Sequence, residues 1–396
     1  MTTNEFISIH KAEDVADLAL RLKQYPEVDA AYALVQIAGW QKAVQKLPEL
    51  ANIKGWIWPK KLSMEQCSSE ETARIKRQII GDTYTTGADL TGGAGVDSYY
   101  LSERAETWHY VEQQEDLCTM AEHNFRLVGR PIRVHHCSAE SFAESMPDVD
   151  VAFIDPARRN VHGGKVFKLE DCSPNLSTLL PSLLPHCKRL LIKLSPMLDI
   201  SEAMRQLSAA NRAYIIAVRN EVKELLILFD KESERNKELE HTDNHLITAI
   251  NIMRNSAESY SFTEAEEAAA IAQYLSPTEP VEGYLYEPNA AILKAGAFRL
   301  MSERYAVRKL GINTHLYQSD ELVEAFPGRI WKIQAVVDKT KQKLLSGQQA
   351  NILTRNYPLK PDDIRKKLKL RDGGEQYIIG ARIADKAVLL LADRIK

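Results

Sequence analysis

Apolar residues follow two different patterns along this chain, and the change between them marks a boundary. Between residues 9 and 50 they recur at helical spacing, as at Val15, Leu18 and Leu22, which is typical of amphipathic helices. Further on they gather into short, nearly continuous runs, which are typical of strands buried in a parallel sheet. The pattern therefore predicts an N-terminal helical region over residues 1–75 and a sheet after it.

The apolar runs predict the strands of one sheet. The first strands are expected at residues 108–112, 132–136 and 149–159 and in the run RLLIKL that precedes Ser195. Residues 213–218 and 224–230 are two further strands, separated by the short connection RNEVK as in a hairpin. The charged residues 231–245 are predicted to form a loop, and residues 246–252 another strand. The sheet domain is therefore placed at residues 76–278.

A linker and a change of pattern mark the third region. The segment SPTEP at residues 276–280 has two prolines and small polar residues, which disfavour continuous structure. After it, helices are predicted at residues 290–299 and 330–345. Strands are predicted at residues 376–383 and 387–391. This mixture predicts an α+β C-terminal domain over residues 281–396.

The segment ADLTGGAGVD at residues 88–97 places a carboxylate directly before a glycine-rich turn. Such a turn between a strand and a helix lets the backbone approach a ligand, and the helix N-terminus favours an anion. A dinucleotide would put its diphosphate in this turn, where Asp89 would repel it, whereas the methionine ammonium of S-adenosylmethionine would be attracted. Asp89 therefore favours S-adenosylmethionine. Ser98, which stands where a dinucleotide fingerprint has its last glycine, also disfavours a nicotinamide cofactor.

Further cofactor contacts are predicted at the ends of the next runs. Glu112 ends the run WHYVE, where a ribose-binding carboxylate is usually found. After the following run, an adenine would be held by loop backbone and one polar side chain, for which we favour Ser138 over Glu140. The predicted cofactor-binding residues are Asp89, Thr91, Gly93, Gly95, Glu112, Ser138, Ala139 and Asp155.

The order Asp-x-x-x-Gly-x-Gly, strand-end Glu and Asp-Pro resembles class I S-adenosylmethionine-dependent methyltransferases over about residues 75–230. The resemblance implies an α/β fold with a Rossmann-like, mostly parallel sheet whose last strand is antiparallel, and it implies S-adenosylmethionine as the cofactor. Residues 67–80, 193–199 and 285–296 are similar to a bacterial group of candidate methyltransferases. Proteins of this group have a THUMP-like C-terminal domain, which the resemblance places at residues 281–396.

The predicted reaction site follows the run that ends in Asp-Pro. In related enzymes that methylate exocyclic amines of bases, this motif is Asp or Asn, Pro, Pro and an aromatic residue, whereas here Ala157 and Arg158 follow Asp155 and Pro156. The resemblance implies that Asp155 and the Pro156 carbonyl accept hydrogen bonds from a target NH2, with no metal and no covalent intermediate. The Arg158 guanidinium can stack on a base in place of the aromatic ring. Lys193, at the same sheet edge, either faces the substrate or only covers the edge.

Charge narrows the choice of partner only in part. A net charge of −3 does not by itself indicate a nucleic-acid-binding protein. Residues 355–371, however, hold seven basic residues against Asp362 and Asp363, and this basic run could contact phosphates or be a solvated helix face. With the Asp-Pro motif and the THUMP-like resemblance, it favours RNA as the substrate. A protein or small-molecule amine as acceptor, and a non-catalytic module that binds cofactor or RNA, stay open as alternatives.

Composition bears on location and on metals. Five cysteines without a Cys-x-x-Cys pair argue for a reducing compartment and against a zinc site or a disulfide framework, so no metal is expected. The N-terminus lacks an apolar signal core, and no run reaches the roughly 18 apolar residues that cross a bilayer, so a cytoplasmic protein is expected. Trp56 and Trp58, flanked by lysines, are interpreted as buried residues at a domain junction rather than as RNA contacts.

Overall fold

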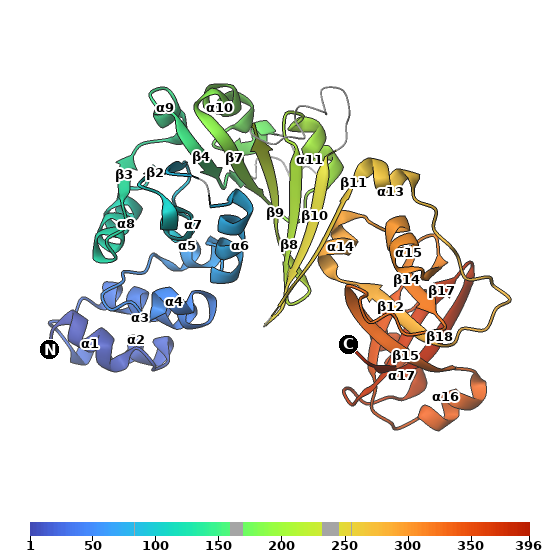
Figure 1. Cartoon of the computed structure of the whole chain (residues 1–396). Coiled ribbons are helices and arrows are strands. Elements are labelled where there is room, and N and C mark those ends of the chain that lie inside the picture. The colour runs from blue at the N-terminus through green and yellow to red at the C-terminus, as the bar shows by residue number, and fades with distance from the viewer. Residues whose placement is uncertain (83, 159–168, 232–244, 255) are drawn as a thin grey trace. The chain divides into compact units, whose positions relative to one another are not determined.

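The computed structural model of the chain describes residues 1–82, 84–158, 169–231, 245–254 and 256–396 (Figure 1). These residues form two compact units, Met1–Asn211 with Glu224–Glu240 and Arg212–Lys223 with His241–Lys396. Most of the predicted loop at residues 231–245 lies outside the described residues. No helix within the described ranges has both the length and the apolar character that crossing a membrane requires.

The first unit begins with helices, as the helical period predicts. They are α1 (Thr3–His10), α2 (Val15–Arg21), α3 (Ala30–Lys46), α4 (Pro48–Ala51), α5 (Lys61–Gln66) and α6 (Glu70–Ile80). Side-chain oxygens of Thr2, Asp14 and Asp29 accept hydrogen bonds from the first free N–H groups of α1, α2 and α3, which fixes where these helices start. Phe6 and Leu18 belong to the apolar core that these helices share.

The two tryptophans at the junction are buried, and this confirms their predicted role. Trp58 packs so closely on Gly39 of α3 that a Cβ there would lie 2.3 Å from the Trp58 Cβ. Trp56 meets the ring of Tyr99 edge to face. The helical region is therefore joined to the sheet by a continuous apolar core.

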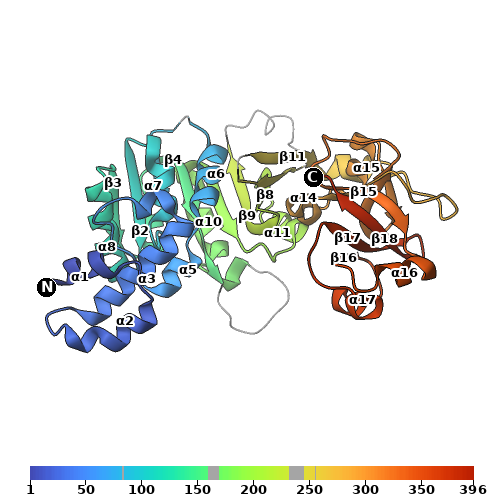
Figure 2. The same ribbon diagram turned by 90° about the horizontal axis from the view of Figure 1, so that it is seen from below.

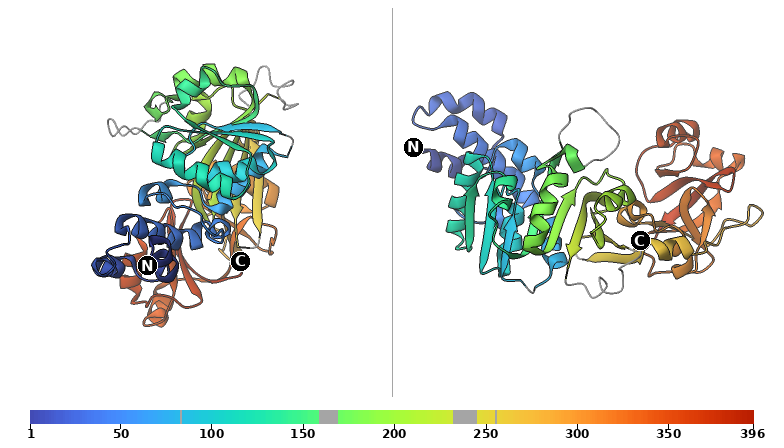
Figure 3. Two further views of the ribbon diagram at one scale, coloured as in Figure 1. Left: turned by 90° about the vertical axis from the view of Figure 1, so that its left-hand side faces the viewer. Right: turned by 90° about the horizontal axis from the view of Figure 1, so that it is seen from above.

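Most strands of the first unit are parallel and belong to a nine-stranded sheet. Their order is β9-β7-β4-β1-β2-β3, with bounds Glu221–Asp230, Cys187–Leu194, Val149–Ile154, Thr86–Asp89, Thr107–Glu112 and Ile132–His136. Strand β9 runs antiparallel to β7, which agrees with the predicted sheet. Helices lie on both faces of these strands (Figure 3): α7 (Val96–Leu101), α8 (Glu115–Leu127), α9 (Ala139–Ala143), α10 (Leu176–Leu183) and α11 (Ile200–Gln206). The predicted α/β fold class is confirmed.

The second unit holds the remaining strands of that sheet and a sheet of its own. Strand β10 (Leu246–Ile252) is parallel to β8 (Arg212–Val218) and antiparallel to β11 (Ala257–Thr263). Strands β8 and β9 are joined by Arg219 and Asn220, both with positive φ (51° and 66°), so the predicted hairpin is correct and its turn is shorter than RNEVK.

The second unit also has several helices and a C-terminal sheet of seven strands. The order of these strands is β13-β14-β12-β15-β18-β17-β16, with bounds Arg308–Gly311, Thr314–Ser319, Tyr284–Pro288, Gly328–Val336, Lys386–Arg394, Gln376–Ile383 and Asn351–Arg355. The helices are α13 (Glu264–Ala269), α14 (Ala290–Ala295), α15 (Arg299–Tyr305), α16 (Lys339–Leu345) and α17 (Pro361–Leu368), and α17 lies beside β16 (Figure 2). The predicted α+β character is therefore correct.

One predicted helix, at residues 330–345, is only half correct. Residues 339–345 form helix α16, whereas residues 330–336 belong to strand β15. Ile330 and Trp331 are both buried, and from Trp331 onwards buried and exposed side chains alternate, since Ile333 is buried and Lys332 and Gln334 are exposed. This period of two is typical of a strand with one covered face, so the predicted helical period was the wrong one here. The predicted domain limits at 75, 278 and 281 stay a proposal.

Candidate functional site

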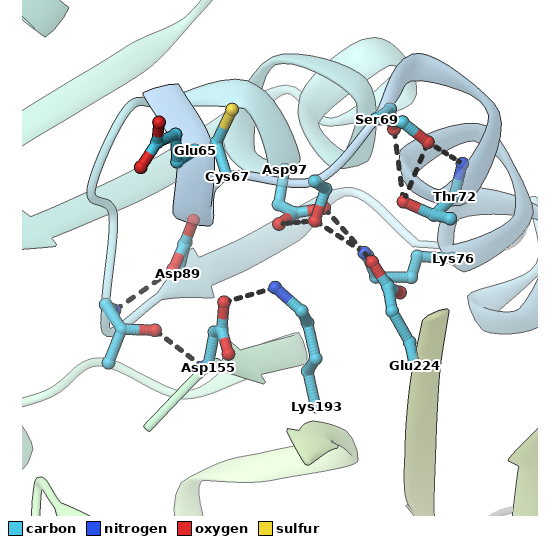
Figure 4. Close-up of polar contacts among 12 residues, drawn as sticks. Glu65, Cys67, Ser69, Thr72, Lys76, Asp89, Asp97, Asp155, Lys193 and Glu224 are labelled. Carbon is cyan, nitrogen blue, oxygen red and sulfur yellow. Dashed lines mark hydrogen bonds and ion pairs between the residues drawn. The ribbon is translucent and has the colours of Figure 1, made fainter. Parts of the chain in front are cut away.

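A cleft opens at the carboxyl ends of the parallel strands of the first unit, where ligands bind in open α/β sheets (Figure 4). It is lined by the glycine turn after β1, the ends of β2 and β4, the start of α9 and part of the N-terminal helical region. Predicted cofactor residues on its wall are Asp89, Thr91, Gly93, Glu112, Ser138, Ala139 and Asp155. The sequence-based prediction and the cleft thus coincide for these seven residues.

The turn between β1 and α7 has a shape that favours glycine at three positions. A Cβ on Gly92 would lie 2.1 Å from the ring of Tyr110, so this glycine lets backbone and ring meet, and the sequence prediction missed it. Gly93 and Gly95 have φ of 53° and 76°, which other residues rarely adopt. Tyr110 donates a hydrogen bond of 2.7 Å to the Gly93 carbonyl and fixes the turn.

Asp89 lies at the tip of β1 with its carboxylate almost completely buried. Its Oδ2 accepts a hydrogen bond from Ser98 Oγ at 2.7 Å, and its Oδ1 accepts from the Thr91 N–H at 3.0 Å. Burial raises the pKa of Asp89 to about 7, although these two hydrogen bonds favour the charged form. Within the described residues no lysine or arginine forms an ion pair with it. A cationic ligand in the cleft would therefore meet an unneutralised carboxylate.

Glu112 and Ser138 line the cleft beside the ends of β2 and β3. The two oxygens of Glu112 accept hydrogen bonds from the backbone N–H groups of Gly93 (3.0 Å) and Gln114 (2.9 Å), so the carboxylate is fixed beside the glycine turn. Ser138 Oγ accepts from the Ser141 N–H and caps α9. Its hydroxyl proton stays available to a ligand, and Glu140 lines the same wall.

Asp155 follows β4 directly and is held from two sides. Its backbone N–H donates to Thr91 Oγ1 at 2.7 Å, which ties it to the glycine turn. Its Oδ2 accepts a hydrogen bond of 2.5 Å from Lys193 Nζ at the end of β7. Burial raises the pKa of Asp155 and the ammonium of Lys193 opposes this rise. The predicted acceptor-side residues Asp155 and Lys193 thus form one partly buried ion pair.

Arg158, the fourth residue of the motif, is described only in its backbone. It forms the short strand β5 (Ala157–Arg158), which pairs antiparallel with β6 (Cys172–Ser173). Ala157 and Ser173 line the cleft, so this ribbon is part of its wall. The stacking role predicted for Arg158 stays a prediction.

A buried charge cluster beneath the cleft was missed by the sequence analysis. Lys76 of α6, with a fully buried side chain, lies 2.7 Å from Glu224 of β9 and 3.1 Å from Asp97 of α7, and it donates to Ser68 Oγ (Figure 4). Burial disfavours the charged form of Asp97, but Lys76 and Lys193 outweigh it and lower the pKa of this carboxyl. Since Asp97 also lines the cleft, the cluster fixes part of its floor.

The N-terminal helical region supplies one wall of the cleft. Ser63 and Gln66 of α5 and Cys67 after it line the cleft together with Asp89 and Asp97. No disulfide links any of the cysteines in the described part of the chain. Within the part of the chain that is described, no group of three or more His, Cys, Asp and Glu residues could hold a metal ion.

Known proteins and protein families are similar to this chain, and one solved structure is similar over its whole length. A family model described as a ferredoxin-like domain matches residues 284–327, and one described as THUMP domain-like matches residues 328–394. A crystal structure described as that of a candidate methyltransferase from Porphyromonas gingivalis W83 is 31% identical, with a TM-score of 0.84, over 100% of this chain and 98% of that chain. Proteins from two Mycobacterium tuberculosis strains, described as uncharacterised S-adenosylmethionine-dependent methyltransferases, are 23% identical over 87% of this chain and 90% of theirs.

Proposed function

Since this chain belongs to the class I S-adenosylmethionine-dependent methyltransferases with a THUMP-like C-terminal domain, we propose that it methylates RNA at the exocyclic amine of a base. The observation that carries the proposal is the position of Asp155. Its carboxylate is held at the end of β4, in the same cleft as the glycine turn and Asp89. A hydrogen-bond acceptor beside the methyl donor is what an amine nucleophile requires.

The residues of the cleft suit S-adenosylmethionine. Asp89 offers a buried carboxylate to the methionine ammonium, and Glu112 offers one to the ribose hydroxyls. Ser138 and Ala139 lie where an adenine would meet loop backbone and one hydroxyl. When bound, the cofactor supplies an electrophilic methyl group on a positively charged sulfur.

The acceptor amine would be oriented by the Asp-Pro motif. Asp155 accepts a hydrogen bond from one amine proton and the Pro156 carbonyl accepts the other, which directs the nitrogen lone pair towards the methyl group. Asp155 is fixed, because it is bonded through its backbone to Thr91 and through its side chain to Lys193. Neither a metal nor a covalent intermediate takes part in this scheme.

Three features support RNA as the substrate class. They are the Asp-Pro motif, the THUMP-like match at residues 328–394 and the basic run at residues 355–371. In that run Arg355 forms an ion pair with Glu287, and Arg365 forms one with Asp372. The other basic residues of the run have exposed side chains. The exposed basic residues are Lys360, Lys366, Lys367, Lys369 and Arg371. We place the reaction in the cytoplasm, where free thiols such as those of this chain persist.

The first test is transfer of a labelled methyl group into RNA. Total RNA from cells that lack the protein is incubated with labelled S-adenosylmethionine and either wild-type protein or Asp155→Ala. Label in nuclease-sensitive material with wild type alone is the expected result. If wild type binds the cofactor but labels no RNA, the RNA proposal is wrong. Label that survives nuclease treatment would instead identify a protein or small-molecule acceptor.

A further inference from the structure

Lys193 and Asp155 form an ion pair in which each side chain keeps unused hydrogen-bonding capacity. They lie at the ends of β7 and β4, which are neighbouring parallel strands, and Nζ is 2.5 Å from Oδ2 (Figure 4). Within the described residues this is the one hydrogen bond that either side chain makes. An ammonium has three N–H donors and a carboxylate has two acceptor oxygens. The pair therefore presents a free donor and a free acceptor next to each other.

The position of Lys193 differs from that of a lysine that only covers the edge of a sheet. Its side chain is 13% exposed, and that of Asp155 is 33% exposed towards the cleft. Asp155 lines the cleft, and the Lys193 ammonium is hydrogen-bonded to it at the margin of the space where an acceptor would lie.

We infer that Lys193 and Asp155 together recognise a base edge on which the amine lies next to a hydrogen-bond-accepting ring nitrogen, as in adenine and cytosine. The inference rests on the proposed function and specifies its substrate. Asp155 accepts from the amine and Lys193 donates to the neighbouring ring nitrogen, so a base taken out of its stack is read along its Watson–Crick edge. A ribose hydroxyl or a ring carbon lacks this pair of groups. Lys193 is in this way a residue that determines specificity.

The transfer step balances without a further reactant. The amine lone pair forms the new N–C bond while the electrons of the S–C bond stay on sulfur, which becomes a neutral thioether. The methylated amine then loses one proton to the carboxylate of Asp155 and from there to water. Lys193 stays protonated throughout, because its part is to donate a hydrogen bond to the base.

The test uses Lys193→Met in the full-length protein, with Lys188→Met as the matched control. Lys188 lies near the start of the same strand and pairs with Asp150, outside the cleft. First, wild type methylates RNA and the modified nucleoside is identified by mass spectrometry. Then kcat/KM is measured on a short RNA with the natural base and on one whose neighbouring ring nitrogen is replaced by C–H. Binding of S-adenosylmethionine is measured in parallel by calorimetry.

The inference predicts a methyl group on the exocyclic amine of adenine or cytosine and not on that of guanine, whose neighbouring Watson–Crick ring nitrogen carries a hydrogen and cannot accept. It also predicts about a 100-fold loss of kcat/KM for Lys193→Met, the loss expected for one fixed donor, with little change in cofactor affinity and none for Lys188→Met. On the RNA with the C–H base, the kcat/KM of wild type should fall by a similar factor, whereas the kcat/KM of Lys193→Met should fall little further. Equal further loss in both proteins would overturn the inference, and so would a modified ribose or ring carbon. If Lys193→Met does not fold, the kcat/KM of wild type on the RNA with the C–H base tests the inference by itself.

Failure of the proposed function has a different signature. If wild type transfers no methyl group to any RNA, the proposed function is wrong and no RNA base is recognised. If wild type methylates RNA but tolerates the C–H base, the proposed function stands and the role of Lys193 is overturned.

Discussion

Asp89 couples cofactor binding to protonation. Its pKa of about 7 in the folded chain lies far above that of an unfolded aspartate near 4, so the folded protein binds the extra proton between these values. Stability therefore falls as the pH rises from about 4 to about 7, and the loss is complete above 7. Asp89→Asn should raise the melting temperature of the free protein at pH 8 by a few degrees. It should also abolish the increase that S-adenosylmethionine gives wild type, and thermal unfolding measures both effects.

The same carboxylate sets the pH dependence of binding. Because the charged form attracts the cofactor ammonium, affinity should fall about tenfold for each pH unit below 7, as titration calorimetry would measure. Asp116→Asn, at an exposed ion pair on α8, is the control and should change neither property. An affinity that is constant from pH 5 to pH 8 would contradict the assignment of Asp89.

Residues at strand ends could be placed from the sequence, whereas the buried charge cluster could not. Glu112 and Asp155 come at the ends of apolar runs and Asp89 precedes the glycine turn, and parallel strands bring their carboxyl ends to one edge. Lys76 resembles a solvated lysine among the other charges of its helix, because its partner Glu224 is far away in the sequence. The resemblance at residues 67–80 covered Lys76 but said nothing of its burial.

Lys76 of α6 forms ion pairs with Asp97 of α7 and Glu224 of β9, and so links these three elements. Removing one partner of a buried ion pair leaves an uncompensated charge, which costs about 3–5 kcal/mol. Lys76→Met should therefore lower the free energy of unfolding by that amount, as urea denaturation would measure. Lys60→Met, which breaks an exposed pair with Asp116, should cost less than about 1 kcal/mol.

A double variant separates charge from packing in this cluster. Lys76→Met with Glu224→Leu removes both charges and should recover part of the stability that Lys76→Met loses, since an apolar pair can replace a buried ion pair. A double variant that is less stable than both single variants would mean that the lysine acts mainly through its packing.

Strands β2 and β3 carry a histidine pair that makes their pairing sensitive to acid. The rings of His109 and His135 stack, with Nδ1 and Nε2 2.9 Å apart. Burial, and then the charges of His135 and Arg133, lower the pKa of His109 to about 4. Between pH 6.5 and pH 4 the unfolded chain takes up a proton that the folded chain refuses, so stability falls as the pH falls through this range. His109→Phe should weaken this dependence, as melting temperatures at pH 7 and pH 5 would reveal. An unchanged difference would exclude the pair as its cause.

At the level of elements, the sequence is informative where a run is buried on one face or bounded by turns. The strands at residues 132–136, 246–252 and 376–383 have the predicted limits. Residues 330–336 were misassigned although buried and exposed side chains alternate there, because Ile330, Ile333 and Val337 also fit the i, i+3, i+7 spacing of a helix.

The whole molecule combines a methyltransferase cleft with a THUMP-like part, and the order of these parts was predictable from the cofactor motifs and the family resemblance. Domain limits were harder to predict, because β8, β10 and β11 belong to the nine-stranded sheet yet lie in the second compact unit. Contacts between strands, rather than proline-rich segments, decide which residues form a compact body.

RNA binding by the THUMP-like part should depend on the exposed basic face of α17. Lys366 and Lys367 are exposed there. The two arginines nearby are already paired: Arg365 of the same helix with Asp372, and Arg355 of β16 with the buried Glu287. Lysines that contact phosphates release counterions, so Lys366→Ala with Lys367→Ala should weaken binding to all RNA sequences alike. The slope of log affinity against log salt should fall by about one to two, as filter binding at several salt concentrations would measure.

The control for that prediction removes two positive charges elsewhere. Lys23→Ala with Lys54→Ala changes the net charge by the same amount at exposed positions of the N-terminal helical region. Equal losses from both double variants would mean that binding follows net charge and that α17 is only a solvated helix. A loss confined to the α17 variant, with S-adenosylmethionine affinity unchanged, would assign substrate capture to the THUMP-like part and methyl transfer to the cleft of Asp89 and Asp155.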